Sequence, residues 1–188
     1  LGATVGNIIN CSYKLLSQVK PDAMLVLGDT NSCLSVIPAK RLHIPIFHME
    51  AGNRCFDECL PEETNRRIVD IISDVNMCYS EHARRYLNAS GVAKERTYVT
   101  GSPMAEVLHQ NLAEIEASDV HARLGLEKGK YILLSAHREE NIDTEKNFKS
   151  LFTAINAMAE KYDMPILYSC HPRSRKRLEQ SGFKLPAG

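Results

Sequence analysis

Hydrophobic and polar positions alternate along this chain with two different periods, and each period predicts one kind of element. In the first twenty residues apolar side chains recur at spacings of three, four and seven, which predicts an amphipathic helix with the stripe Val5, Ile8, Ile9, Leu15, Leu16 and Val19. Short apolar runs of strand length follow at residues 23–27, 44–49, 75–79 and 97–99. Helical segments separate these runs, so the pattern predicts strand–helix units in a parallel sheet covered on both faces.

The second half of the chain repeats this pattern after a polar interval at residues 103–130, which offers no strand candidate. Predicted strands return at 131–135 and 165–168, around a long helix with the apolar stripe Phe148, Phe152, Ile155, Met158 and Tyr162. The fold class is therefore α/β, with two Rossmann-like parallel-sheet domains that are both incomplete. Residues 1–103 form the C-terminal part of the first domain, and residues 104–188 form linker helices and the first part of the second. The start at Leu1 rather than Met also predicts a segment of a longer protein.

Composition and charge narrow the class of partner. Of 188 residues, 44% are hydrophobic and 24% are charged, as in a soluble globular protein. Lysine plus arginine and aspartate plus glutamate both number 23, so the net charge is zero. Net charge therefore does not favour binding to nucleic acid or to an anionic membrane. The sequence has no apolar run of about 18 residues and no charged-then-apolar leader, which predicts neither membrane insertion nor secretion.

Six scattered cysteines predict free thiols in a reducing cytoplasm rather than a disulfide framework. Cys55 and Cys59, with His48 nearby, suggest a metal site, but a single Cys-x3-Cys lacks the second ligand pair that zinc requires. We therefore predict no metal.

Chemically capable side chains follow several of the predicted strands directly. Asp29, Glu50, His137 and His171 stand at these positions, and ligands of such sheets bind at the carboxyl ends of the strands. Each has an ordinary alternative, since Asp29 could cap a helix, His137 could be a loop histidine and Glu50 could be solvated. Four such residues at one edge favour a cleft between the two half-domains.

A second group of polar residues opens the helix that begins at Pro61, a residue suited to the first helical position. Glu62 and Arg66 are four residues apart and can point together into one cleft, although a solvated surface pair has the same spacing. Glu63 is expected on the helix surface. Carboxylates that move protons and a cation that holds an anion suit the elimination of a phosphate-type leaving group.

Missing motifs exclude several chemistries. The sequence lacks a Gly-x-x-x-x-Gly-Lys-Ser/Thr phosphate loop, a Gly-x-Gly-x-x-Gly dinucleotide turn and an Asp-x-Asp pair that would hold a metal against a nucleotide diphosphate. It also lacks the Gly-x-Ser-x-Gly elbow of serine hydrolases. Kinase, dehydrogenase, metal-dependent sugar transfer and serine hydrolase functions are therefore disfavoured.

Six motifs in order resemble the non-hydrolysing UDP-N-acetylglucosamine 2-epimerase family. They are Gly28-Asp29-Thr30, His48-x-Glu50-Ala51-Gly52, Pro61-Glu62-Glu63-x-Asn65-Arg66, Thr100-Gly101-Ser102-Pro103, His137-Arg138-Glu139-Glu140-Asn141 and His171-Pro172-Arg173. The resemblance runs from about residue 23 to the end of the chain. The longer stretches 48–57 and 135–141 look most like the branch that makes UDP-N-acetyl-L-fucosamine from the corresponding L-talose sugar.

This resemblance implies two Rossmann-like domains in the glycosyltransferase-B arrangement, with the UDP-sugar between them. The implied reaction inverts C2 of a UDP-N-acetylhexosamine by anti elimination of UDP and re-addition, for cell-surface polysaccharide precursors. It implies no cofactor and, for the full-length protein, a homodimer. Motif position assigns catalysis to Asp29, Glu50, Glu62 and His137. It assigns substrate binding to Arg54, Asn65, Arg66, Gly101, Ser102, Arg138, Glu140, Asn141, His171 and Arg173.

The sequence also departs from the family pattern at both ends. The Gly-x-Arg-Pro-Glu loop that contacts the nucleotide and the C-terminal Ser and Glu that bind uridine and ribose are absent, so the 188-residue chain alone is expected to be inactive. A glycosyltransferase of the same architecture and a non-catalytic nucleotide-sugar-binding protein are the alternatives. Neither requires three carboxylates around one sugar carbon, and the triple Asp29, Glu50 and Glu62 therefore favours the epimerase.

Overall fold

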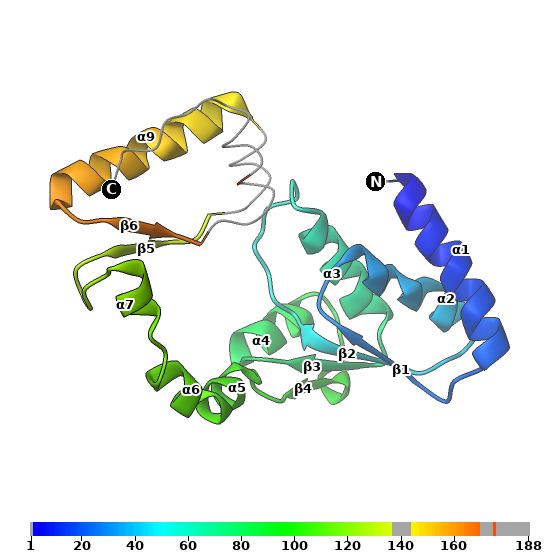
Figure 1. Cartoon of the computed structure of the whole chain (residues 1–188). Helices are drawn as coiled ribbons and strands as arrows, with labels where there is room; N and C mark the ends of the chain where they lie inside the picture. Colours follow the sequence, from blue (N-terminus) through cyan, green and yellow to red (C-terminus); the bar gives the residue numbers. More distant parts are fainter. Residues whose placement is uncertain (1, 137–143, 170–174, 176–188) are drawn as a thin grey trace. The chain divides into compact units, whose positions relative to one another are not determined.

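The computed structural model describes residues 2–136, 144–169 and 175, which divide into the units Leu1–Gln110 and Asn111–Gly188 (Figure 1). The first unit contains a four-stranded sheet in the order β1-β2-β3-β4, and the second contains the pair β5-β6. Every neighbouring pair of these strands is parallel. The predicted α/β class with parallel sheets is confirmed.

The elements of the first unit follow the predicted alternation. The strands are β1 (Met24–Leu27), β2 (Ile46–Ala51), β3 (Val75–Cys78) and β4 (Thr97–Val99). The helices are α1 (Gly2–Val19), α2 (Val36–Arg41), α3 (Pro61–Ile72), α4 (Glu81–Ala89) and α5 (Met104–Gln110), with the short 3-10 turns η1 (Asn31–Ser35) and η2 (Lys94–Arg96). Strand β2 extends two residues beyond the predicted end at Met49, so that Glu50 lies within the strand.

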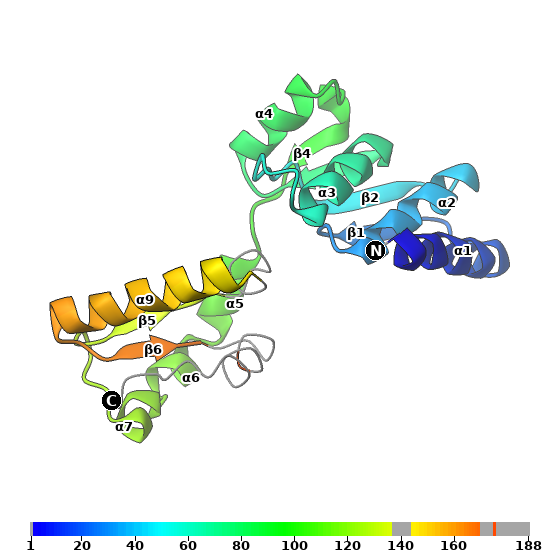
Figure 2. The same ribbon diagram turned by 90° about the horizontal axis from the view of Figure 1, so that it is seen from above.

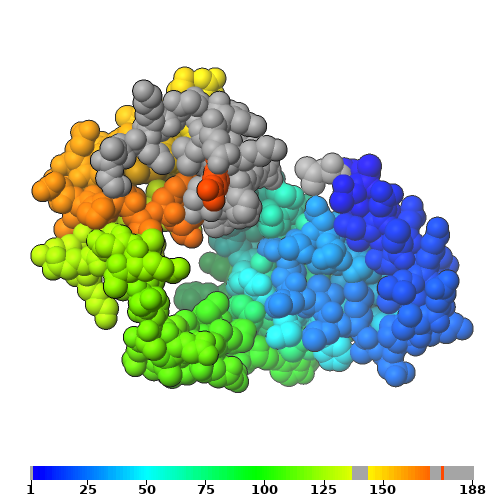
Figure 3. Space-filling model, in the orientation of Figure 1, coloured from blue at the N-terminus to red at the C-terminus, as the bar shows by residue number. Residues whose placement is uncertain are grey.

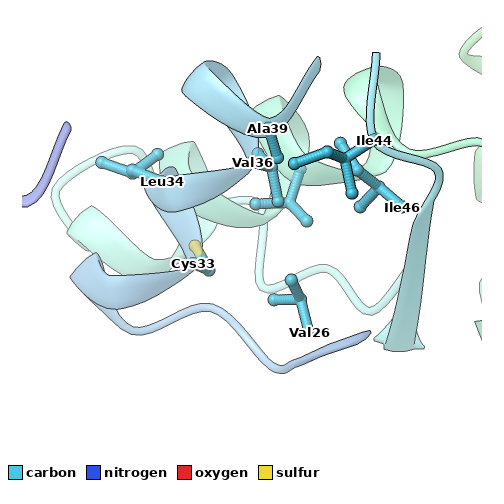
Figure 4. Close-up of a cluster of buried hydrophobic side chains, with 8 residues drawn as sticks. Val26, Cys33, Leu34, Val36, Ala39, Ile44 and Ile46 are labelled. Atoms are coloured by element: carbon cyan, nitrogen blue, oxygen red, sulfur yellow. The ribbon is translucent and has the colours of Figure 1, made fainter. Parts of the chain in front are cut away.

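The core of the first unit lies between the sheet and its helices. Val26 and Ile46 project from neighbouring strands toward Val36 and Ala39 of α2, and Val69 of α3 completes this cluster (Figure 4). A smaller cluster joins Ala51 and Cys78 to Ala83 and Leu87 of α4. Helix α1, blue in Figure 3, is peripheral: none of its described residues is buried, and Leu15 and Val19 of the predicted stripe are exposed.

The described residues leave the opposite face of this sheet uncovered, whereas the sequence predicted a sheet covered on both faces. Leu25 and Leu27 are 65% and 63% exposed, and the strand register places them in line with Phe47 and Met49 of β2. The cause is topological. Helices α2, α3 and α4 each connect adjacent strands, and right-handed crossovers in one direction place all of them on the same face. Figure 2 looks down on this helical layer.

The second unit contains α6 (Leu112–Glu116), α7 (Val120–Leu124), β5 (Ile132–Leu134), α9 (Glu145–Tyr162) and β6 (Ile166–Tyr168). Phe148, Phe152 and Ile155 of α9 are buried against both strands. The predicted stripe is wrong at its end, since Met158 and Tyr162 are exposed where α9 continues past the short strands. No helix in the described part of the chain has the length and apolar composition to cross a membrane.

Candidate active site

The carboxyl ends of β1 and β2 bring Asp29 and Glu50 together. Gly28 continues the strand pairing, because its N–H donates to the Met49 oxygen at 3.2 Å. Gly28 has a φ of +75°, and a Cβ at this position would lie 3.3 Å from Oε2 of Glu50. Glycine therefore provides both the left-handed turn that leads to Asp29 and the close approach of Glu50.

Glu50 occupies a β-bulge with an uncommon backbone conformation. Met49 pairs with Met77 and Ala51 pairs with Cys78, which leaves Glu50 as the extra residue of β2. Its φ is +66°, a left-handed value that costs a non-glycine residue about 1–2 kcal/mol. Bulges of this kind re-aim a side chain and are frequent beside active sites. The Glu50 side chain is 32% exposed and can be reached by a ligand.

Arg66 of α3 joins the two carboxylates. Its Nη2 pairs with Oδ2 of Asp29 and lies 3.5 Å from Oε1 of Glu50, and its Nη1 donates to the Glu50 backbone oxygen. The Arg66 side chain is 8% exposed, while that of Asp29 is 21% exposed. Because both of its terminal nitrogens contact protein acceptors, Arg66 orients two accessible carboxylates at this edge of the sheet.

Asn65, the neighbour of Arg66, fixes the segment that follows β1. Its Nδ2 donates to the backbone oxygen of Asp29 and to Oδ1 of Asn31, both at 3.0 Å. Asn65 is buried, so α3 holds Asp29 through two consecutive residues.

A second buried group lies one turn further along α3, around Asp70. Arg54 donates to its Oδ2 at 2.7 Å, and the Gly52 N–H donates to its Oδ1 at 3.1 Å. Nδ1 of His48 lies 3.0 Å from Oδ1, an ion-pair distance without hydrogen-bond geometry, and Nε2 of His48 lies 3.1 Å from the Gly28 oxygen. The Arg54 guanidinium thus points into the protein, where its partner Asp70 also contacts His48 and Gly52.

The two glutamates that open α3 have different environments. Glu62 is exposed and makes no hydrogen bond or ion pair with another described residue. Glu63, predicted on the surface, is buried and accepts hydrogen bonds from the Cys55 N–H at 3.0 Å and from Arg67 at 2.8 Å. Burial acts to raise the pKa of Glu63, but these hydrogen bonds outweigh it and hold the pKa below its ordinary value. Glu63 is buried because the loop after β2 folds back over the first turn of α3.

Gly101 and Ser102 follow β4, and both are exposed. The Thr100 N–H donates to the Cys78 oxygen at 2.9 Å, and Oγ of Ser102 accepts from the Met104 N–H at 3.3 Å. Within the described chain they make no hydrogen bond or ion pair with the group around Arg66. The remaining predicted site residues lie outside the described residues: His137, Arg138, Glu140, Asn141, His171 and Arg173.

Two residues near this site were not predicted. Asp70 continues the spacing of Glu62 and Arg66 by four residues, a signal that could have identified it. Tyr79 follows β3 and is partly buried; burial and then the negative charge of Glu50 raise its pKa. Tyr79 could have been found as a polar side chain at a third strand end.

Two buried cysteines near the site, Cys33 and Cys78, have raised pKa values, which disfavours the reactive thiolate. Burial raises the pKa of Cys33 to about 11, and the charge of Asp29 adds to this effect. Burial and the charge of Asp70 raise the pKa of Cys78 to about 11 as well. In the part of the chain that the structure describes, no three His, Cys, Asp or Glu side chains gather in a group that could hold a metal ion.

Comparisons with known proteins agree on one family. The family model of UDP-N-acetylglucosamine 2-epimerase matches residues 1–186. A UDP-N-acetylglucosamine 2-epimerase of Methanococcus maripaludis is 35% identical over 97% of this chain and 51% of its own length. A UDP-2,3-diacetamido-2,3-dideoxy-D-glucuronate 2-epimerase of Pseudomonas aeruginosa is 32% identical over 98% of this chain and 51% of its own.

Solved structures give the same result. The UDP-N-acetylglucosamine 2-epimerase of Rickettsia bellii is 48% identical, with a TM-score of 0.86 over 95% of this chain and 47% of its own. The Methanocaldococcus jannaschii enzyme, solved in complex with UDP-GlcNAc and UDP, is 34% identical, with a TM-score of 0.86 over 96% of this chain and 51% of its own. The chain spans about half the length of the curated relatives that it matches.

Proposed function

Because the chain belongs to the UDP-N-acetylglucosamine 2-epimerase family, we propose that the full-length protein interconverts a UDP-N-acetylhexosamine and its C2 epimer. The observation that carries this proposal is the pair of accessible carboxylates, Asp29 and Glu50, held by the buried Arg66 at adjacent strand ends. The complex of the Methanocaldococcus jannaschii relative with UDP-GlcNAc and UDP supports a UDP-sugar as the substrate.

The proposed reaction has two halves. In the first, a carboxylate removes the C2 proton, the C1–O bond to UDP breaks, and a 2-acetamidoglycal forms. In the second, a carboxylic acid returns a proton to the opposite face of C2 while UDP adds again at C1. The two halves are redox-neutral, so the reaction requires no hydride acceptor. We assign proton transfer to Asp29, Glu50 and Glu62, since side chains positioned for proton transfer contribute about 10²–10⁴-fold to such steps.

The arrangement of charge explains why carboxylates and a cation belong together here. Arg66 lowers the repulsion between Asp29 and Glu50 and fixes their directions, so both can act on one sugar carbon. Asn65 supports the same segment. Binding of the UDP-sugar is assigned to the family positions Asn65, Arg66, Gly101, Ser102, Arg138, Glu140, Asn141, His171 and Arg173, and His137 is assigned to catalysis. Arg54 is left out, because its guanidinium pairs with the buried Asp70. We further propose that the full-length protein has two domains in the glycosyltransferase-B arrangement, forms a homodimer and acts in the cytoplasm.

Product analysis without an added acceptor tests this function. The full-length protein is incubated separately with UDP-GlcNAc and with the UDP-linked L-talose sugar of the fucosamine branch, and the nucleotide sugars are separated and identified by NMR. An epimerase converts at least one of them to its C2 epimer until equilibrium. A glycosyltransferase instead requires an acceptor and releases UDP, and a binding protein leaves both sugars unchanged, so either result contradicts the proposal.

A further inference from the structure

Asp70 is a fully buried carboxylate that contacts β2 and the loop after it at three points around Glu50. Its Oδ1 accepts from the Gly52 N–H at 3.1 Å and lies 3.0 Å from Nδ1 of His48, and its Oδ2 accepts from Arg54 at 2.7 Å. These partners stand two residues before, two residues after and four residues after Glu50. Asp70 thus holds the chain on both sides of the bulge.

The bulge needs such support because its backbone is strained. Glu50 has a φ of +66° and Gly52 a φ of +78°, so two left-handed residues lie within three positions. Strained conformations persist where their surroundings over-determine them. The hydrogen bond from Gly52 to Asp70 fixes one side of Glu50, and the contacts of His48 with Asp70 and the Gly28 oxygen fix the other.

The backbone of Asp70 is itself anchored. Asn76 is fully buried in β3, and its Nδ2 donates to the Asp70 oxygen at 2.9 Å. One face of α3 therefore supports Glu50 twice: Arg66 contacts the Glu50 carboxylate, and Asp70, one turn later, contacts His48 of the same strand and Gly52 just after it.

A carboxylate suits this position better than any neutral side chain. It offers two acceptor oxygens to Gly52 and Arg54 and compensates the Arg54 charge, whose side chain is almost fully buried. An asparagine of the same size would turn an N–H₂ group toward one of these donors. An aspartate at position 70 is therefore explained by its contacts around the bulge, since its side chain does not reach solvent.

We propose that Asp70 is a positioning residue of the epimerase: it holds the β2 bulge so that Glu50 points at C2 of the sugar. This inference rests on the proposed function. It adds a residue that acts through Glu50 and does not touch the substrate. A misplacement of about 1 Å can cost a reaction about 100-fold, so loss of Asp70 affects turnover more than binding.

The test compares Asp70→Asn with Asp74→Asn in the full-length protein. Asp74 is a matched control, because it follows α3 directly after its C-cap Ser73 and accepts from the Ile46 N–H at 3.0 Å, but at the end of β2 opposite to Glu50. We expect Asp70→Asn to lower kcat about 100-fold with KM for the UDP-sugar within threefold, and Asp74→Asn to leave both unchanged. Circular dichroism and thermal melting give the folded fraction, to which rates are normalised.

If Asp70→Asn does not fold, Asp70→Glu replaces it in the test. This variant keeps the charge beside Arg54 but adds a methylene that pushes on Gly52, and we expect kcat to fall about tenfold with KM unchanged. Wild-type kcat in the folded variant, or a KM that rises in proportion to the loss of kcat/KM, would overturn the role of Asp70. An unsubstituted protein without epimerase activity would instead overturn the proposed function.

Discussion

Gly52 packs directly against the backbone of Ala83 in α4: a Cβ at Gly52 would lie 2.4 Å from the Ala83 oxygen. The same Cβ would lie 2.9 Å from Cγ of Leu87. Gly52 therefore lets helix α4 approach the strand end that carries Glu50, and it also adopts a φ of +78°. We expect Gly52→Ala to destabilise the protein by at least about 2 kcal/mol, because the contact and the backbone strain add.

Gly91→Ala is the matched control for this prediction. Gly91 has a φ of +87°, but nothing lies within 4 Å of a Cβ built there. Its replacement introduces only backbone strain, about 1–2 kcal/mol. Urea unfolding of the three proteins measures both effects, and equal losses for the two variants would show that the approach of α4 to Gly52 is unimportant.

The lowered pKa of Glu63 predicts that the free energy of unfolding depends on pH. Its folded-state pKa lies below the ordinary value of 4.5, so the native state binds this proton less readily than the unfolded chain. The stabilisation is therefore present above pH 4.5 and is lost as the pH falls below it, through the folded pKa. Asp74 acts in the same direction, because its bonds with Lys40 and the Ile46 N–H outweigh burial and lower its pKa.

Glu63→Gln tests this pH dependence. The variant should lose about 1.5–3 kcal/mol at pH 7, where the charged hydrogen bonds are intact, and progressively less below the ordinary carboxyl range. Urea unfolding over this range measures the difference. Glu62→Gln is the control, since Glu62 is exposed on the same turn of α3. A Glu63→Gln deficit that is constant with pH would contradict the charge-based account.

The strands and the strand-end residues could be predicted from the sequence because both depend on local patterns. Apolar runs identify β1 to β4, and the rule that polar groups follow parallel strands identifies Asp29 and Glu50. Glu63 and Asp70 could not be assigned in the same way. Their burial depends on a loop and a bulge that bring residues 8 to 18 positions apart into contact, and helical spacing does not contain that information.

The uncovered face of the sheet could not be predicted from the apolar pattern of β1 either. Alternating Leu25, Val26 and Leu27 read as a strand buried on both sides, yet only Val26 is buried. Apolar patterning indicates which faces can be buried, whereas the crossover order decides which of them the described helices cover.

Substrate preference is a further prediction, based on the resemblance of residues 48–57 to the L-fucosamine branch. The loop after Glu50 is anchored by Arg54 to Asp70, by Cys55 to Glu63 and by an edge-on contact of Phe56 with Tyr86 at 5.3 Å. If this loop lines the sugar site, the full-length protein should turn over 6-deoxy-L-sugar nucleotides faster than UDP-GlcNAc, because an additional hydroxyl leaves polar groups unpaired. A competition assay with both sugars decides it, and a preference for UDP-GlcNAc would contradict this branch.

Transfer of the C2 proton is the central claim, and solvent deuterium tests it most directly. In D2O the full-length protein should place deuterium at C2 of the recovered UDP-sugar, as read by NMR and mass spectrometry. Glu50→Gln should slow this exchange by about 10²–10⁴-fold with folding intact, because the amide cannot accept the proton. Glu114→Gln, at an exposed position of α6, should exchange like the parent. Epimerisation without deuterium at C2, or near-normal exchange by Glu50→Gln, would contradict the account.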